Sequence, residues 1–391
     1  MLKQRFIYIK NLFYEIVEVT EINAKSILRK HKKIDSWFVS RYGMNIYRGC
    51  AHDCVYCDGR AEKYQTHKDF ESKVIVKKNA VGLLKKELTP NPRRKTLKPG
   101  FVMIGGGVGD SYQPIEKQYK ITRGVLKYLY TTNFPVHILT KSTLVERDID
   151  ILKQINSKTR AIVSFSFSSV DDEISKIFEP GVPSPSKRLE TIKKLKDEGF
   201  FCGMFLMPVI PFITDNPKLI EESVKKAKDA GVDFIIFSGM TLKDGRQKEY
   251  FFKTLKENYP NLLVEYNHIY RGDKWGSAIP EYYNSIHKTF SFFARQYKMP
   301  VRIPSVIFND FLDKTDLVTV ILDQIDYLLK MHGSKSAYGF ASYSISQLQK
   351  PIEGQRNNLR KIKGVGPTIE RNILEIIDTG TCNYYEKLMK L

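Results

Sequence analysis

Short apolar runs alternate with amphipathic stretches along the middle of the chain. Runs rich in β-branched and aromatic residues predict six strands, which lie at 42–49, 100–107, 135–142, 160–169, 200–211 and 234–239. The stretches between them, such as 114–133 and 185–199, carry apolar residues at helical spacing. Nearly continuous apolar strands that alternate with helices indicate a parallel sheet covered on both faces.

Six strand–helix units are too few for a closed eightfold barrel. The sequence therefore predicts an α/β fold with an open, partial barrel, whose working end is the carboxyl edge of its strands. We expect a small all-helical domain after it. The predicted division is an N-terminal extension (1–41), the partial barrel (42–305), a helix and a polar connector (306–350), and a compact helical domain (351–391). Within these parts, 313–333 is predicted to be a helix and 334–355 to be the connector.

The overall charge indicates a polyanionic partner. Lys and Arg outnumber Asp and Glu by 63 to 43, which gives a net charge of +20 among 391 residues. A Lys-rich, solvated surface is the alternative explanation. The N-terminus carries no signal-peptide pattern, and no apolar run reaches the ~18 residues of a membrane span. The five cysteines are odd in number and mostly clustered, so we expect a cytoplasmic protein in a reducing compartment, without a membrane partner.

Three of those cysteines lie within eight positions, in the segment 45–60. Cys50, Cys54 and Cys57 form a C-x3-C-x2-C pattern just after the first predicted strand, where thiolates converge on one soft metal centre. A structural zinc site needs a fourth ligand, and His52 lies awkwardly between the others. Three ligands without a fourth suit an iron–sulfur cluster with one open iron. Zinc, or a chance grouping of cysteines, remains open.

This pattern, with an aromatic residue before the last cysteine, resembles the cluster motif of the radical S-adenosylmethionine (radical SAM) superfamily. The resemblance implies a [4Fe-4S] cluster that binds SAM and cleaves it reductively to a 5'-deoxyadenosyl radical. It extends over about residues 25–300 to the spore photoproduct lyase-like, or DNA repair photolyase-like, family. The segments that carry it, in order, are 37–60, 108–126, 138–152, 178–195 and 207–215.

The resemblance assigns site residues one by one. It places Cys50, Cys54 and Cys57 on the cluster. It implies contacts with SAM from or beside Tyr56, Gly105, Gly106, Gly107, Asp110, Lys141, Ser142, Ser166, Glu179 and Arg188. The alternatives are that the glycines only form a tight turn, that the strand-end hydroxyls cap the next helix, and that Glu179 and Arg188 form a surface ion pair.

The resemblance does not name a catalytic residue beyond the cluster. Spore photoproduct lyase returns hydrogen to its product from a further cysteine, and no cysteine stands at a matching position here. Cys202 could replace it if it points into the barrel, although a lone cysteine in an apolar strand is usually a small core residue. We therefore expect lyase-like radical chemistry on nucleic acid, with flavodoxin or ferredoxin as electron donor. RNA, peptide or small-molecule substrates are alternatives, as is a zinc-stabilised binding protein without catalytic activity.

The C-terminal segment from Leu359 resembles the helix-hairpin-helix of family X DNA polymerases. Gly364 and Gly366 would turn the chain tightly, and Pro367 fits the first position of the next helix. The exposed backbone N–H groups there suit phosphate, and Lys361 and Lys363 flank the turn. DNA is thus the favoured partner, and a packing hairpin without nucleic acid is the alternative. The segment 77–99, with eight basic residues against one acidic, is expected to be a surface helix and loop.

Overall fold

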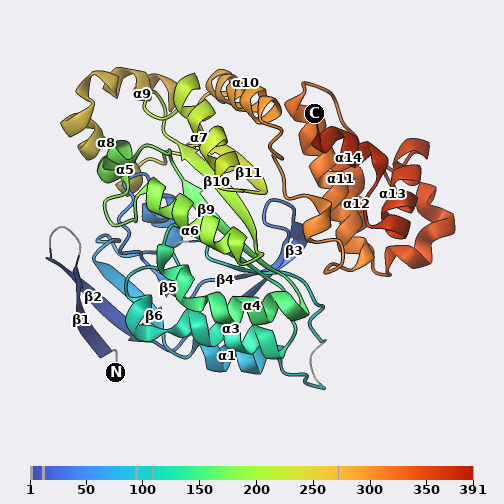
Figure 1. The fold of residues 1–391 in the computed structure, drawn as a ribbon, viewed down its shortest axis with the longest axis horizontal. Helices are drawn as coiled ribbons and strands as arrows, with labels where there is room; N and C mark the ends of the chain where they lie inside the picture. The colour runs from blue at the N-terminus through green and yellow to red at the C-terminus, as the bar shows by residue number, and fades with distance from the viewer. Residues whose placement is uncertain (1–2, 11–13, 93–95, 108, 272, 391) are drawn as a thin grey trace.

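The computed structural model describes residues 3–10, 14–92, 96–107, 109–271 and 273–390. Its centre is a seven-stranded sheet, curled into a half-barrel, in the order β11-β10-β9-β8-β7-β4-β3 (Figure 1). The bounds are β3 Leu28–Asp35, β4 Ser40–Met44, β7 Val102–Ile104, β8 Val136–Thr140, β9 Ala161–Phe167, β10 Phe201–Val209 and β11 Phe234–Gly239. All neighbours pair in parallel except β3, which runs antiparallel to β4 at the edge. The predicted fold class, with six parallel strands, is confirmed.

Helices cover the outer face of this sheet, because alternate strand residues on that face are apolar. They are α3 Ile121–Thr131, α4 Ile149–Lys158, α6 Pro185–Asp197, α7 Pro217–Asp229 and α10 Pro280–Gln296. Val163, Phe165, Cys202 and Met204 lie in one buried cluster with side chains of these helices. Cys202 is fully buried on this helix-covered face, so it is a core residue as expected, and the alternative that it points into the barrel is wrong.

A smaller sheet supports the segment that carries the cysteines. Its order is β1-β2-β6-β5, with bounds β1 Lys3–Lys10, β2 Tyr14–Ile22, β6 Lys73–Lys77 and β5 Tyr47–Arg48. The strand predicted at 42–49 is therefore two strands, because β4 ends at Met44 and Tyr47 pairs with Val76 of β6. The segment 1–41, predicted only as an extension, supplies strands to both sheets. The basic segment contains the expected helix, α1 Ala80–Leu88, and its residues 93–95 lie outside the described chain.

The C-terminal helices lie together at the end of the half-barrel where the strands begin (Figure 1). Their bounds are α11 Lys314–Met331, α12 Tyr338–Ser346, η6 Ile352–Lys361, α13 Pro367–Thr379 and α14 Asn383–Met389. Ile162, Phe205 and Phe234 of the sheet share one buried cluster with these helices. The connector expected at 334–355 contains α12, so that expectation is wrong. Small and hydroxyl residues on its buried face, such as Ala341 and Ser342, hide the helical pattern in the sequence.

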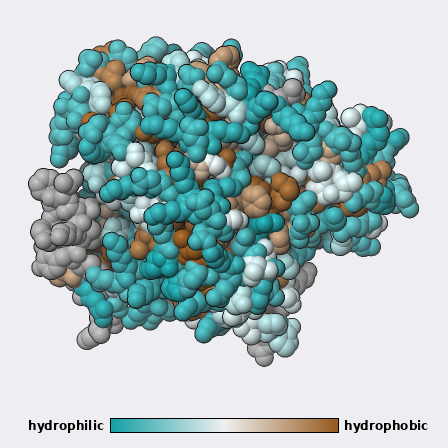
Figure 2. Space-filling model, viewed as in Figure 1, coloured by the Kyte–Doolittle hydropathy of each residue, from teal (hydrophilic) through white to brown (hydrophobic). Residues whose placement is uncertain are grey.

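The other elements are short or lie around the mouth of the half-barrel. They are η1 Asp58–Arg60, η2 Glu62–Tyr64, α2 Glu116–Tyr119, η3 Thr143–Asp148, α5 Asp172–Phe178, α8 Arg246–Asn258, η4 Pro260–Leu262, α9 Leu263–Ile269 and η5 Ser305–Ile307. Most of the visible surface is hydrophilic, with small apolar patches between hydrophilic residues (Figure 2). No helix in the described part of the chain has the length and apolar character needed to cross a bilayer.

Candidate active site

The cysteine-bearing segment leaves β5 and crosses the mouth of the half-barrel. Cys50 and Cys54 are buried, Cys57 is partly exposed, and all three are free thiols. Burial raises the pKa of each thiol above its usual value, and neighbouring acidic groups raise it further. Cys57 lies close enough to Cys50 and Cys54 to contribute to the raised pKa of both. The loop thus gathers three thiols whose deprotonation a cationic centre would favour.

Two residues far along the chain fix the backbone of this loop. The Gln113 side chain donates to the Gly49 carbonyl (3.1 Å) and accepts from the Ala51 N–H (3.0 Å), so it holds the chain on both sides of Cys50. Gly181, beyond α5, donates its N–H to the His52 carbonyl at 3.1 Å. A Cβ atom on Gly181 would stand only 2.6 Å from the Ala51 carbonyl oxygen, so this approach requires glycine.

Asp110 joins the loop to the end of β8. Its carboxylate accepts hydrogen bonds from the Thr140 hydroxyl and from the backbone N–H of Tyr112 and Lys141, and it lies 3.3 Å from His52 Nε2. Burial alone would raise the pKa of Asp110, but the His52 ring and the backbone N–H groups of Lys141 and Tyr112 hold it below its ordinary value. In the structure this residue therefore acts as a charged anchor for the cysteine loop.

A polar network lies beside Cys54, built from β8, β9, α6 and the loop itself. Lys141 Nζ donates to Glu179 Oε1 (2.9 Å) and Ser166 Oγ (3.0 Å). Arg188 Nη2 donates to Glu179 Oε2 at 2.5 Å, and the Tyr56 hydroxyl also donates to Glu179. Burial opposes ionisation of Glu179, yet the charges of Arg188 and Lys141 hold its pKa well below the usual range. The structure therefore brings these five predicted residues together.

The Glu179–Arg188 pair is fully buried, so the alternative of a surface ion pair is wrong. Ser142 differs from the other predicted residues. Its hydroxyl accepts from the Leu144 N–H and caps η3, as the capping alternative expects. The structure does not place Ser142 in the polar network.

The glycine run after β7 makes close backbone contacts of its own. Gly105 and Gly106 have φ of +89° and +77°, and a Cβ on Gly105 would lie 2.0 Å from the Leu139 carbonyl oxygen. With Gly107, they line a cleft of about 340 Å³ beside β3, together with the basic side chains of Arg29 and Lys77. None of the three cysteines lines that cleft. Their backbone conformation and close contacts thus explain why glycine stands at these positions without reference to a ligand.

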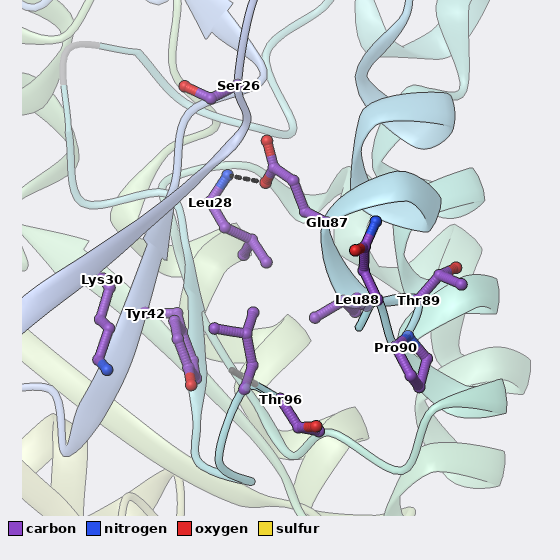
Figure 3. Close-up of a pocket in the computed structure, with 11 residues that line it drawn as sticks. Ser26, Leu28, Lys30, Tyr42, Glu87, Leu88, Thr89, Pro90 and Thr96 are labelled. Atoms are coloured by element: carbon purple, nitrogen blue, oxygen red, sulfur yellow. Dashed lines mark hydrogen bonds between the residues drawn. The ribbon is translucent and has the colours of Figure 1, made fainter. Parts of the chain in front are cut away.

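A separate hollow of about 270 Å³ lies between β3 and α1 (Figure 3). There Glu87 accepts hydrogen bonds from the backbone N–H groups of Ile27 (2.9 Å) and Leu28 (2.8 Å). This contact ties the edge strand to the helix layer. None of the predicted site residues lines the hollow.

Comparison with known proteins places this geometry in a family. Residues 44–219 match the model of the radical SAM superfamily. A Methanocaldococcus jannaschii protein named as uncharacterized is 30% identical over 273 residues, which cover 70% of this chain and 94% of that protein. The chain belongs to the radical SAM superfamily. A Mycobacterium tuberculosis protein, also named as uncharacterized, is 30% identical over 256 residues, which cover 64% of this chain and 73% of that one.

Among solved structures, spore photoproduct lyase complexed with dinucleoside spore photoproduct is similar in fold. The TM-score is 0.51 at 15% identity, over 71% of this chain and 79% of that one. The half-barrel with the cysteine loop at its mouth is thus a radical SAM fold, and the protein is a radical SAM enzyme.

Membership of the radical SAM superfamily implies SAM and an iron–sulfur cluster. Within the described chain, no group of three or more His, Cys, Asp or Glu side chains is arranged to hold a single metal ion. Three free thiols on one buried loop, without a disulfide between them, are the donors that an iron–sulfur cluster uses. The donor chemistry of the loop therefore fits such a cluster.

Several residues that hold this radical SAM site were not assigned to it from the sequence. Gln113 is one, and Gln247 of α8 is another, since its side chain donates to the Tyr56 carbonyl at 3.0 Å. Arg60 pairs with Asp53 and with Glu71, and its guanidinium lies 3.6 Å from the centre of the Tyr250 ring. These contacts join distant segments, and only the folded chain reveals them.

The predicted nucleic-acid residues lie elsewhere, at the C-terminal helices. Gly364 has φ +87° and Gly366 precedes Pro367, the first residue of α13. Lys361, Lys363 and both glycines are exposed. The radical SAM family match ends at residue 219, so it does not include this turn. Its identity as a helix-hairpin-helix stays a prediction.

Proposed function

We propose that this radical SAM enzyme carries a [4Fe-4S] cluster on Cys50, Cys54 and Cys57 and acts on nucleic acid, with a DNA lesion as the favoured substrate. The observation that carries the first part is the placement of three free thiols on one loop beside the Lys141–Glu179 network, with Cys50 and Cys54 buried and Cys57 partly exposed. When bound, the cluster and SAM supply reductive cleavage to a 5'-deoxyadenosyl radical, which removes hydrogen from the substrate.

The chain's own residues prepare this site. Gln113, Gly181 and Asp110 fix the loop, and burial keeps water from the Cys50 and Cys54 thiols. Lys141 lies near Cys54 and retains a small exposed area, so its ammonium group can meet a carboxylate that binds beside the cluster. Ser166 offers a hydroxyl at the same place, and Glu179 and Arg188 hold Lys141 in position. We therefore propose Lys141 and Ser166 as contacts of SAM.

Three observations support nucleic acid as the substrate class. The net charge is +20. The turn before α13 exposes Gly364 and Gly366 and follows two exposed lysines, an arrangement that suits phosphate contacts. Spore photoproduct lyase, which is similar in fold, has been solved with a dinucleoside photoproduct. Cys202 lies in the outer core, so hydrogen return to a product radical needs another donor in this chain.

Anaerobic reconstitution tests the cluster. We expect about four irons per chain and reductive cleavage of SAM. Cys54→Ala should lose both, because two thiolates cannot hold the cluster in place of three. Cys202→Ala is the matched control: it removes a buried thiol outside the loop and should retain iron and SAM cleavage. Normal SAM cleavage by Cys54→Ala would contradict the assignment.

A substrate panel tests the proposed action on nucleic acid. DNA containing defined photoproducts, undamaged DNA, structured RNA and a peptide are each incubated with the reconstituted enzyme, and formation of 5'-deoxyadenosine is measured. We expect DNA lesions to increase it above the substrate-free rate. An increase with peptide alone would reject nucleic acid as the substrate, while an increase with RNA alone would keep the class and reject DNA.

A further inference from the structure

One face of α12 exposes two aromatic side chains next to the Gly-Val-Gly turn. Phe340 and Tyr343 are 48% and 56% exposed, and their spacing of three residues puts them on the same side of the helix. We call these two residues, together with Lys363, the aromatic patch. Large apolar side chains that are exposed side by side often mark an interaction site.

The patch is continuous with the turn. A Cβ atom on Gly364 would stand 2.6 Å from Phe340 Cδ1, so the absence of a side chain there lets the ring lie against the backbone. Lys363 Nζ lies 5.5 Å from the centre of the Phe340 ring. An aromatic face and a cation are thus presented together at the start of α13.

Near the patch, two arginines form ion pairs, whereas two lysines do not. Arg356 and Arg360 form ion pairs with Asp378 and Glu370. Lys361 and Lys363 are exposed and have no ion pair with any residue in the described part of the chain. Unpaired lysines beside exposed rings are complementary to a ligand that has both negative charge and flat, stackable groups. A single-stranded nucleic acid has both, because its bases are free to stack.

We propose that the aromatic patch stacks unpaired bases of a nucleic acid whose phosphates contact Lys361 and Lys363. This inference rests on the proposed action on nucleic acid and specifies it: the C-terminal helices prefer single-stranded or locally unpaired segments to intact duplex. A protein partner fits less well, because the centres of protein interfaces are depleted of lysine.

The position of the patch makes it an anchor. The C-terminal helices share a core with the beginnings of β9, β10 and β11, whereas the cysteine loop crosses the opposite end of the half-barrel (Figure 1). Apolar side chains appear between hydrophilic ones over this C-terminal lobe (Figure 2). The patch therefore holds the nucleic acid away from the radical site.

Fluorescence anisotropy with the full-length protein tests the proposal. The probes are a labelled oligo-dT of about 16 nucleotides and a duplex of equal length, over a range of salt concentrations. Phe340→Ala and Tyr343→Ala should each weaken binding of the single strand about tenfold, with an unchanged salt slope. Lys363→Ala should lower that slope by about 0.7, because one phosphate contact is lost. Duplex binding should respond to the lysine and not to the rings.

Matched variants separate stacking from folding. Phe292→Ala removes an exposed ring (57%) on α10 and should bind like the wild type. Tyr343→Phe keeps the ring and should also bind normally, and melting curves verify that each variant is folded. Reconstituted Phe340→Ala should retain basal SAM cleavage, since the patch is remote from the cysteines.

The results distinguish base stacking from binding through the lysines alone. If Phe340→Ala and Tyr343→Ala bind the single strand like the wild type, or lose duplex binding equally, the stacking proposal is overturned while binding through lysines stands. If the wild-type protein binds neither probe, or a poly-glutamate peptide displaces oligo-dT at equal charge concentration, nucleic acid recognition at this surface is rejected too. Substrate-free SAM cleavage then still tests the radical chemistry separately.

Discussion

At the scale of single residues, the barrel interior contains polar groups that the sequence pattern of the strands does not predict. His137 lies on the inner side of β8, between the Phe38 carbonyl (2.8 Å) and the Ser164 hydroxyl (2.8 Å). No carboxylate among the described residues faces it, and burial lowers its pKa to about 4. The imidazole is therefore held in its neutral form near pH 7.

This gives a prediction for acid stability. The pKa of His137 is about 4 in the folded state and about 6.5 in the unfolded state. Between these values the unfolded chain binds the proton first, so the stability contributed by the neutral form is present above pH ~6.5 and falls as pH decreases to ~4. We expect His137→Gln to remove about 3 kcal/mol of this pH dependence. Urea unfolding of wild type and variant at several pH values measures the difference, and parallel curves would contradict it.

Residues of the site were predictable to different degrees. The cysteine spacing is local, so the sequence was sufficient to propose those three ligands. Glu179 and Arg188 are nine positions apart, and the sequence could not say whether their pair was exposed, because burial depends on the packing of α6 against β9. Gln113 binds the backbone on both sides of Cys50, at Ala51 and Gly49, which lie 62 and 64 residues before it in the chain. No spacing rule reports such a contact.

At the scale of elements, six barrel strands were predictable because each is a β-branched, apolar run between polar turns. The break between β4 and β5 was not, because both halves of 42–49 favour strand and only the partner differs: β7 for one and β6 for the other. α12 was missed because its sequence shows little helical periodicity. Its buried face combines Tyr338, Ala341 and Ser342 with one large aliphatic residue, so its amphipathic pattern is weak.

The contact between the α5–α6 connection and the cysteine loop gives a prediction at this scale. In Gly181→Ala the new Cβ would meet backbone oxygens of Ala51 and His52 at 2.6 and 2.8 Å, and backbone cannot rotate away as a side chain can. We expect the loop to shift, with a cost of about 1–3 kcal/mol, and the reconstituted protein to retain less iron. Metal analysis after gel filtration measures it.

Gly82→Ala is the control for that variant. Gly82 lies within α1 and a Cβ there meets nothing within 4 Å, so alanine should stabilise the helix by about 0.5–1 kcal/mol and leave the iron content unchanged. Equal iron content in Gly181→Ala and wild type would show that the loop tolerates the added methyl group, and that this contact does not position the cysteines.

At the scale of the whole molecule, the C-terminal helices and the half-barrel share one core. The buried cluster that contains Ile162, Phe205 and Phe234 of the sheet also contains Ile321 of α11 and Ile373 of α13. Deleting 351–391 would therefore expose apolar surface of the remaining chain as well as removing the turn. Point variants of the lysines are consequently a cleaner test of nucleic acid binding than truncation.

The shared core predicts that the two parts unfold together. Trp37, in the turn between β3 and β4, stacks edge-on against Tyr327 of α11 with ring centroids 6.5 Å apart, and Arg302 lies against both rings. Its fluorescence therefore reports whether α11 is docked. The chain has two tryptophans, and the other, Trp275, is exposed, so Trp275→Phe leaves Trp37 as the single reporter.

In urea, the fluorescence of that variant and its far-UV circular dichroism should change in one coincident transition, because undocking the helices uncovers the same core that stabilises the sheet. Arg302→Ala removes the cation between the rings of Trp37 and Tyr327 and should move both curves together to lower urea. A fluorescence change that precedes the loss of circular dichroism would instead mean that the helices undock from an intact half-barrel, as an independent module does.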